Sequence, residues 1–205
     1  ALTSVTDEPG FAQIVAEELG IPPEDVEVRH GDTDRSPYGL GTYGSRSTPV
    51  SGGAVAVVSR KGRDKARQIA GTVLEASPDD LAWEKGRWYV KGDPEKGASI
   101  EEIASRAYSG AEMPEGMEGG LDAQVIYDPP NLTYPYGAYI AVVDIDPDTA
   151  HVSVRRFIAV DDCGVRINPM VVDGQIHGGL AEGIGIALME VLTFQGAAGT
   201  RPSLH

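Results

Sequence analysis

The sequence predicts an α+β fold in which mixed or antiparallel sheets pack with helices. Three observations lead to this prediction: segments with helical hydrophobic spacing, short alternating segments typical of strands, and tight turns between neighbouring strands. The chain has 205 residues, enough for one domain around a real core or for two lobes, 1–120 and 121–205.

The first part of the chain is expected to hold two helices. Phe11, Ile14, Val15 and Leu19 recur at helical spacing, and Gly20 ends this first helix. The expected elements that follow are a half-buried strand at 26–30, a glycine-rich loop at 31–47, and a long helix from 48 to about 75 that Thr48 and Pro49 open.

The remaining part is expected to be richer in strands. Lys85–Gly86 indicates a hairpin turn between strands 81–84 and 87–91, and Ser99 is typical of a helix start. The elements expected after that short helix are a loop at 109–120, strands at 123–127, 138–145 and 151–160 with a turn at 146–149, and an amphipathic helix from Pro169 to about Leu192.

Composition and charge exclude several classes of function. The net charge of −14 is opposite to what a phosphate-tracking nucleic-acid binder needs. Every long apolar run is interrupted, so we expect no transmembrane segment. A single cysteine, Cys163, excludes an internal disulfide and is compatible with a reducing compartment, so we expect a cytoplasmic location.

The first candidate site is the segment at 39–48, which contains the end of the loop and the start of the long helix. Gly44 lets the backbone approach a ligand, and a helix start presents unpaired N–H groups that suit phosphate. Ser45, Ser47 and Thr48 add hydroxyl groups, and Arg46 adds a planar cation. The alternative is an ordinary loop with a Ser/Thr cap, because the segment matches neither a P-loop nor a dinucleotide fingerprint.

The second candidate site runs from 161 into the final helix. Several glycines inside a helical pattern each reduce helix propensity, which indicates close packing or close approach of a ligand. Gln175 can both donate and accept hydrogen bonds, which suits the polar edge of a heterocycle. A helix packed tightly through its glycines explains the pattern equally well.

Other chemistry-bearing side chains receive structural interpretations. The separations of Cys163, His30 and His177 match no zinc pattern, so we expect no metal site formed by these side chains. The carboxylates of Asp161, Asp162 and Asp173 are interpreted as turn and cap residues, because nothing pairs them with a nucleophile. No catalytic residue is therefore assigned. The aromatic residues Trp83, Trp88 and Tyr89 are expected in the core.

Three long motifs occur in order: TYGSRSTPVSGGA from Thr42, YDPPNLTYPYGAYIAVVDID from Tyr127 and DDCGVRINPMVVDGQIHGGLAEGIGIALME from Asp161. Together they resemble the molybdopterin-binding large subunit of the xanthine oxidase family, in particular its aerobic carbon monoxide dehydrogenase branch. FAQIVAEELGIPPEDVEV near the start also matches, so the resemblance covers about 11–191. It implies a partial molybdenum cofactor-binding domain.

The resemblance also implies a cofactor, site residues and partners. The cofactor is molybdopterin cytosine dinucleotide with molybdenum, and the partners are iron–sulfur and flavin subunits. Gln175 matches the glutamine of the family's GQ motif, and the residues that match the segment near the cofactor's phosphate are Gly44, Ser45, Arg46, Ser47 and Thr48.

Departures from the family pattern point to a fragment or truncated relative that is an oxidoreductase by ancestry and inactive in isolation. The family's GQGHET is replaced near the start by residues that include Asp7 and Glu8, and the GVGE motif with its catalytic glutamate is absent. A non-catalytic nucleotide- or pterin-binding or assembly module, and a ligand-free structural lobe, are the alternatives. Exposed apolar surface is expected, and with it a homo-oligomer.

Overall fold

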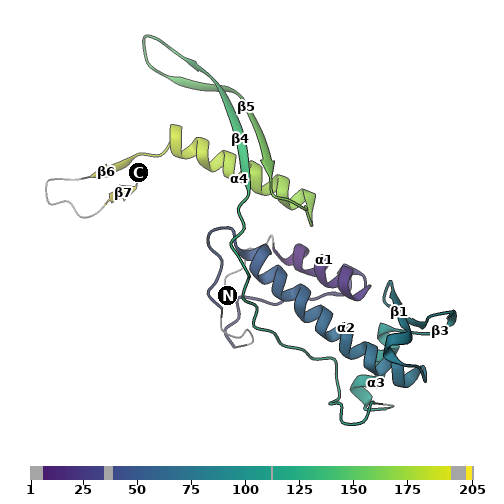
Figure 1. Cartoon of the computed structure of the whole chain (residues 1–205). Helices are drawn as coiled ribbons and strands as arrows, with labels where there is room; N and C mark the ends of the chain where they lie inside the picture. The colour runs from purple at the N-terminus through teal and green to yellow at the C-terminus, as the bar shows by residue number, and fades with distance from the viewer. Residues whose placement is uncertain (1–6, 35–38, 112, 195–201, 205) are drawn as a thin grey trace. The chain divides into compact units, whose positions relative to one another are not determined.

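The computed structural model describes residues 7–34, 39–111, 113–194 and 202–204. The chain divides into two compact units, Ala1–Leu132 and Thr133–His205 (Figure 1). Helices and antiparallel sheets occur together in it, so the α+β prediction is confirmed. None of the described helices is long and apolar enough to cross a membrane.

The first unit is built on a long α-helix with two shorter α-helices and three short 3-10 or π-helical segments. Its helices are α1 (Asp7–Leu19), η1 (Pro23–Asp25), η2 (Ser47–Gly52), α2 (Gly53–Val73), η3 (Pro78–Asp80) and α3 (Ile100–Ser109). As predicted, α1 ends where Gly20 adopts a left-handed conformation with φ 64°. The η2 segment is a π-helical turn that continues directly into α2. The long helix thus begins at Ser47, one residue earlier than expected.

A three-stranded antiparallel sheet completes the first unit, in the order β1 (Leu81–Glu84), β2 (Arg87–Val90), β3 (Asp93–Ser99). The predicted hairpin turn is confirmed: Lys85 and Gly86 both have positive φ, 46° and 79°, as a type I′ turn requires. Ser99 then caps α3 through a capping box with Glu102. The strand β3 was not predicted.

The core of the first unit lies between α2, the sheet and α3. Its buried members are Ala66, Ile69, Ala70, Leu74, Leu81, Trp88, Ala98, Ile103 and Ala107. Trp88 is buried as expected, with its ring centroid 4.7 Å from that of Trp83, which packs at the edge of the core.

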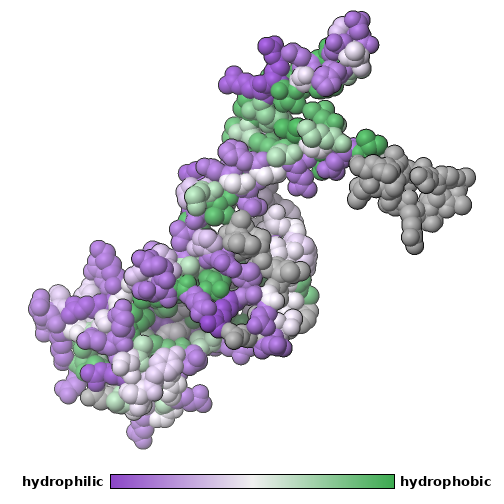
Figure 2. Space-filling view, turned by 180° about the vertical axis from the view of Figure 1, so that it is seen from behind, coloured by the Kyte–Doolittle hydropathy of each residue, from purple (hydrophilic) through white to green (hydrophobic). Residues whose placement is uncertain are grey.

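The second unit contains a long hairpin and a helix. Its elements are β4 (Tyr136–Ile145), β5 (Val152–Asp162), α4 (Pro169–Leu188), β6 (Leu192–Phe194) and β7 (Pro202–Leu204). Asp146 closes the predicted turn by accepting hydrogen bonds from the amides of Asp148 and Thr149, both at 2.9 Å. No residue from 133 to 191 is buried, and apolar side chains gather on the surface of this unit (Figure 2). Residues 133–191 therefore form no buried core.

Two predicted strands are wrong. Residues 26–30 are not paired with another strand, and Arg29 instead forms an ion pair with Glu27 at 2.6 Å. Residues 123–127 lie along α2, where Lys61 Nζ donates to the carbonyl of Gln124 at 3.2 Å. Alternating apolar residues suit a paired strand and an unpaired extended segment equally well. The hydrogen bonds of a strand also need a neighbouring strand, which the local sequence does not specify.

The prediction for the last helix is partly wrong. It starts at Pro169 as expected, capped by Asn168, whose Oδ1 accepts from the amide of Val171 at 3.2 Å. It ends at Leu188, and Leu192 begins a strand. The helix is also not amphipathic, because apolar residues and glycines occur all round it.

Candidate functional site

The first candidate segment forms a tight loop that leads into the long helix. Gly44 and Ser45 form its tip, and both have a positive φ of 57°. On either side of the tip, Arg46 Nη1 donates to Tyr43 Oη at 2.9 Å, and the hydroxyls of Thr42 and Ser47 are 2.7 Å apart. Each of these two contacts joins a residue before the tip to a residue after it.

The donors of this segment differ in exposure. Ser45 and Thr48 are exposed and Arg46 is half-buried, whereas the side chain of Ser47 is buried against Thr42. Arg46 is the N-cap residue of η2, with no side-chain capping bond, so the helix start is not the Ser/Thr cap considered as an alternative. The first turn of η2 therefore begins beside a guanidinium group and two exposed hydroxyls, groups that suit an anionic ligand.

Gln175 lies in the other unit, in the second turn of α4, and is exposed. Its participation in one site with residues 44–48 stays a prediction.

The residues that precede α4 are held by side-chain hydrogen bonds. Tyr139 Oη donates a short hydrogen bond to Asp161 Oδ1, and Gly137 lies beside both groups, where a Cβ would be 2.7 Å from Asp161 Oδ1. This bond raises the pKa of Tyr139 above its ordinary value, because the neighbouring carboxylate disfavours the phenolate. Asp162 accepts from the amide of Gly164 at 2.9 Å, as a turn residue does.

The side chains considered as metal ligands are divided between the two units, with His30 in the first and Cys163 and His177 in the second. His30 Nε2 is 2.7 Å from Glu8 Oε1, and Cys163 is exposed in the second unit. Within the described ranges, no group of three or more His, Cys, Asp or Glu side chains is placed to hold a metal ion.

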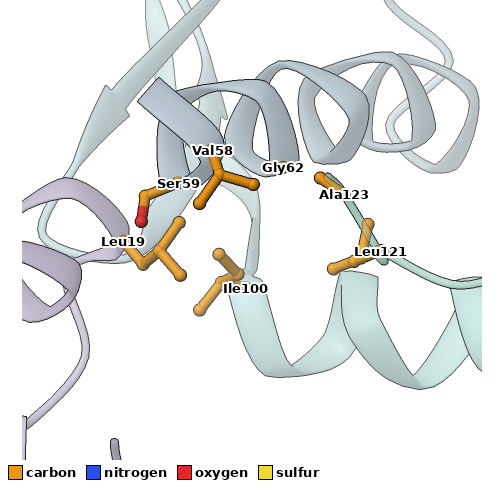
Figure 3. Close-up of a pocket in the computed structure, with 7 residues that line it drawn as sticks. All are labelled: Leu19, Val58, Ser59, Gly62, Ile100, Leu121 and Ala123. Carbon is orange, nitrogen blue, oxygen red and sulfur yellow. The ribbon is translucent and has the colours of Figure 1, made fainter. Parts of the chain in front are cut away.

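A cavity of about 220 Å³ lies in the first unit, between α1, α2, α3 and the segment after Gly120 (Figure 3). It is lined by Leu19, Val58, Ser59, Gly62, Ile100, Leu121 and Ala123. Its only polar side chain is Ser59, so the cavity does not suit a phosphorylated ligand. It shares no residue with the loop at 42–47.

Three residues that contribute to these arrangements received no role from the sequence, although two of them lie inside the first candidate segment. Thr42 and Tyr43 close the first loop, and Tyr139 fixes Asp161. The sequence held a signal for Thr42 and Tyr43. Around the Gly–Ser tip, a Thr–Ser pair is five residues apart and a Tyr–Arg pair is three residues apart.

The chain is similar in sequence to the large chains or subunits of two known enzymes. The carbon monoxide dehydrogenase large chain of Hydrogenophaga pseudoflava is 55% identical over 184 residues, which are 90% of this chain and 23% of that protein. The nicotine 6-hydroxylase large subunit of Paenarthrobacter nicotinovorans is 37% identical over 188 residues, 91% of this chain and 23% of that protein. The chain thus spans less than a quarter of the length of these relatives.

Solved structures agree with this result. A crystal structure of Cu,Mo-CO dehydrogenase in its carbon monoxide reduced state superposes with a TM-score of 0.89 at 48% identity, covering 95% of this chain and 24% of that chain. Quinoline 2-oxidoreductase from Pseudomonas putida 86 gives a TM-score of 0.85 at 38% identity, covering 95% and 25%. The expected kinship with the carbon monoxide dehydrogenase branch is confirmed.

The family model described as "Molybdopterin cofactor-binding domain" matches residues 7–201. This match takes in both candidate segments and almost the whole chain. The chain therefore belongs to the molybdopterin cofactor-binding domain family.

Proposed function

We propose that this chain is the cofactor-binding part of a molybdenum hydroxylase large subunit of the carbon monoxide dehydrogenase type, and that it holds part of molybdopterin cytosine dinucleotide. The observation that carries the proposal is the family match across residues 7–201. The residues proposed to hold the cofactor are Gly44, Ser45, Arg46, Ser47, Thr48 and Gln175.

The chemistry of the loop at 42–47 supports a phosphorylated ligand. Arg46 offers charge-assisted hydrogen bonds, and Ser45 and Thr48 offer exposed hydroxyls beside the first turn of η2. A local cation matters here, because the net charge of −14 disfavours the approach of any anion. Ser47, whose hydroxyl is already paired with Thr42, would contribute through its backbone amide.

Gln175 would hold a different part of the same ligand. An exposed amide can donate and accept at once, as the edge of a pterin or cytosine ring requires. When bound, the molybdenum centre supplies the redox chemistry with which the relatives' class oxidises a small substrate.

We further propose that the chain does not catalyse by itself and works with iron–sulfur and flavin subunits in the cytoplasm. The proposal on activity is supported by the length of the chain, which spans 23% of each of the two relatives described above. The single cysteine is compatible with the proposed location. Self-association into a homo-oligomer is proposed on the exposed apolar residues of the second unit, which include Ile140, Val160 and Met170.

The test is to purify the chain from a host that makes the cofactor, then measure molybdenum by elemental analysis and the bound organic group by mass spectrometry. Stoichiometric molybdenum with a pterin dinucleotide is expected. Arg46→Gln should lower the bound amount, whereas Arg29→Gln, which changes an exposed arginine paired with Glu27, should not. A nucleotide without molybdenum would instead indicate a non-catalytic module, and no bound group at all would indicate a structural lobe.

A further inference from the structure

We propose that Thr42 and Tyr43 are positioning residues for the phosphate-binding segment at 44–48. In this proposal they hold the loop in its binding conformation before a ligand arrives. The inference rests on the proposed function, because positioning matters to binding only if this segment holds the cofactor.

The two contacts that flank the tip of the loop are nested. Thr42 meets Ser47 through their hydroxyls at 2.7 Å, and inside that pair Tyr43 meets Arg46 through a hydrogen bond of 2.9 Å. Because the tip residues, Gly44 and Ser45, lie within both pairs, each contact restricts the same short stretch of backbone. The outer contact is partly sheltered from water, because Ser47 is only 7% exposed while Thr42 is exposed.

The backbone at the tip of the loop has an unusual conformation. Ser45 has a φ of 57°, a left-handed conformation that residues with a Cβ rarely adopt. A residue stays in such a conformation when its surroundings fix it, and such residues cluster at ligand-binding loops. The contacts on either side of the tip are the interactions that fix it here.

The guanidinium group of Arg46 is held by the side chain of Tyr43. Its central carbon lies 4.9 Å from the centre of the Tyr43 ring, and one of its N–H groups is bonded to the Tyr43 hydroxyl. Stacking and hydrogen bonding together hold Arg46 in one orientation and leave its other N–H groups as donors for a ligand. A side chain ordered in advance loses less conformational entropy on binding, which increases affinity.

The experiment uses two pairs of variants of the full chain. Thr42→Val removes the hydroxyl and keeps the shape, whereas Thr42→Ser keeps the hydroxyl. Tyr43→Leu removes both the ring and the hydroxyl, whereas Tyr43→Phe keeps the ring. Two properties are measured for each: the picosecond-to-nanosecond mobility of the Ser45 and Arg46 amides by ¹⁵N relaxation, and the affinity for inorganic pyrophosphate by calorimetry.

We expect Thr42→Val and Tyr43→Leu to increase the mobility of both amides and to weaken pyrophosphate binding by about threefold to tenfold, the effect of losing one or two modest interactions. Thr42→Ser should restore both properties, and Tyr43→Phe should fall between. Tryptophan fluorescence should be unchanged in all four, because Trp83 and Trp88 lie in the sheet and not in the loop.

The outcomes separate the two proposals. If the unaltered chain binds pyrophosphate and all four variants match it in affinity and mobility, the positioning role is wrong while the binding site stands. If the unaltered chain does not bind pyrophosphate, the proposed phosphate site is wrong and the positioning role is wrong with it.

Discussion

Substitution of Gly20 by alanine should destabilise the first unit strongly. Gly20 lies at the end of α1, directly against the β1–β2 turn, and a Cβ there would be 1.9 Å from the backbone nitrogen of Gly86. The φ of 64° adds a conformational penalty of about 1–2 kcal/mol for a residue with a Cβ. Displacing a packed backbone costs about 1–3 kcal/mol more. The expected loss of unfolding free energy is the sum, about 2–5 kcal/mol.

Urea unfolding followed by tryptophan fluorescence measures this loss, because both tryptophans of the chain, Trp83 and Trp88, belong to the first unit. The matched control is Gly110→Ala. Gly110 also ends a helix with a positive φ, 73°, but a Cβ there meets nothing within 4 Å. The control should therefore lose only the conformational part, about 1–2 kcal/mol. Equal losses in the two variants would refute the argument from the close contact with Gly86.

Three further substitutions test other parts of the structure. Gly62→Ala should raise the unfolding free energy by about 0.5–1 kcal/mol in the same urea assay, because alanine favours the helix. The new Cβ has room, since it would lie 3.7 Å from the carbonyl oxygen of Leu121. A lower unfolding free energy would contradict this prediction. Ser99→Ala should lower it by about 1 kcal/mol through loss of the α3 cap, and an unchanged midpoint would argue against the capping box. Tyr139→Phe should remove, from an ultraviolet titration, the tyrosine with a pKa raised by Asp161. Because that pKa is raised on folding, the contribution of Tyr139 to stability is present below its unfolded pKa and is lost as the pH rises through its folded pKa. The wild type should therefore unfold at a higher temperature than the variant near neutral pH, and this difference should disappear at alkaline pH.

Local features of the fold could be predicted from the sequence. The turn at Lys85–Gly86, the cap at Ser99 and the turn closed by Asp146 each depend on residues only a few positions apart, and each is confirmed. In these cases backbone conformation and short-range hydrogen bonds decide the structure, so the residue types carry the information.

Features that depend on distant partners could not be predicted in the same way. Residues 26–30 and 123–127 have the alternation of strands but no strand beside them. Conversely, β3 has the polar sequence DPEKGAS and is a strand because β2 pairs with it. Alternation reports which side of a segment is apolar, whereas pairing is decided by what lies next to it.

In the candidate site, too, some features could be predicted from the sequence and others could not. The sequence predicted a loop and a helix start at 44–48, and the structure has both. The contacts made by Thr42 and Tyr43 could not be predicted, because they depend on side-chain rotamers at the loop ends.

The β4–β5 hairpin has a practical consequence for work with the purified chain. Among the described residues the sheet consists of these two strands, so along each of them one row of backbone amides and carbonyls faces away from the partner strand. Strands of 10 and 11 residues with apolar side chains such as Ile140 and Ile158 are an open template for β-pairing with another copy. Dilute, cold storage and a short interval between purification and measurement should therefore preserve the sample better than concentration does, and turbidity over time will report how quickly copies join.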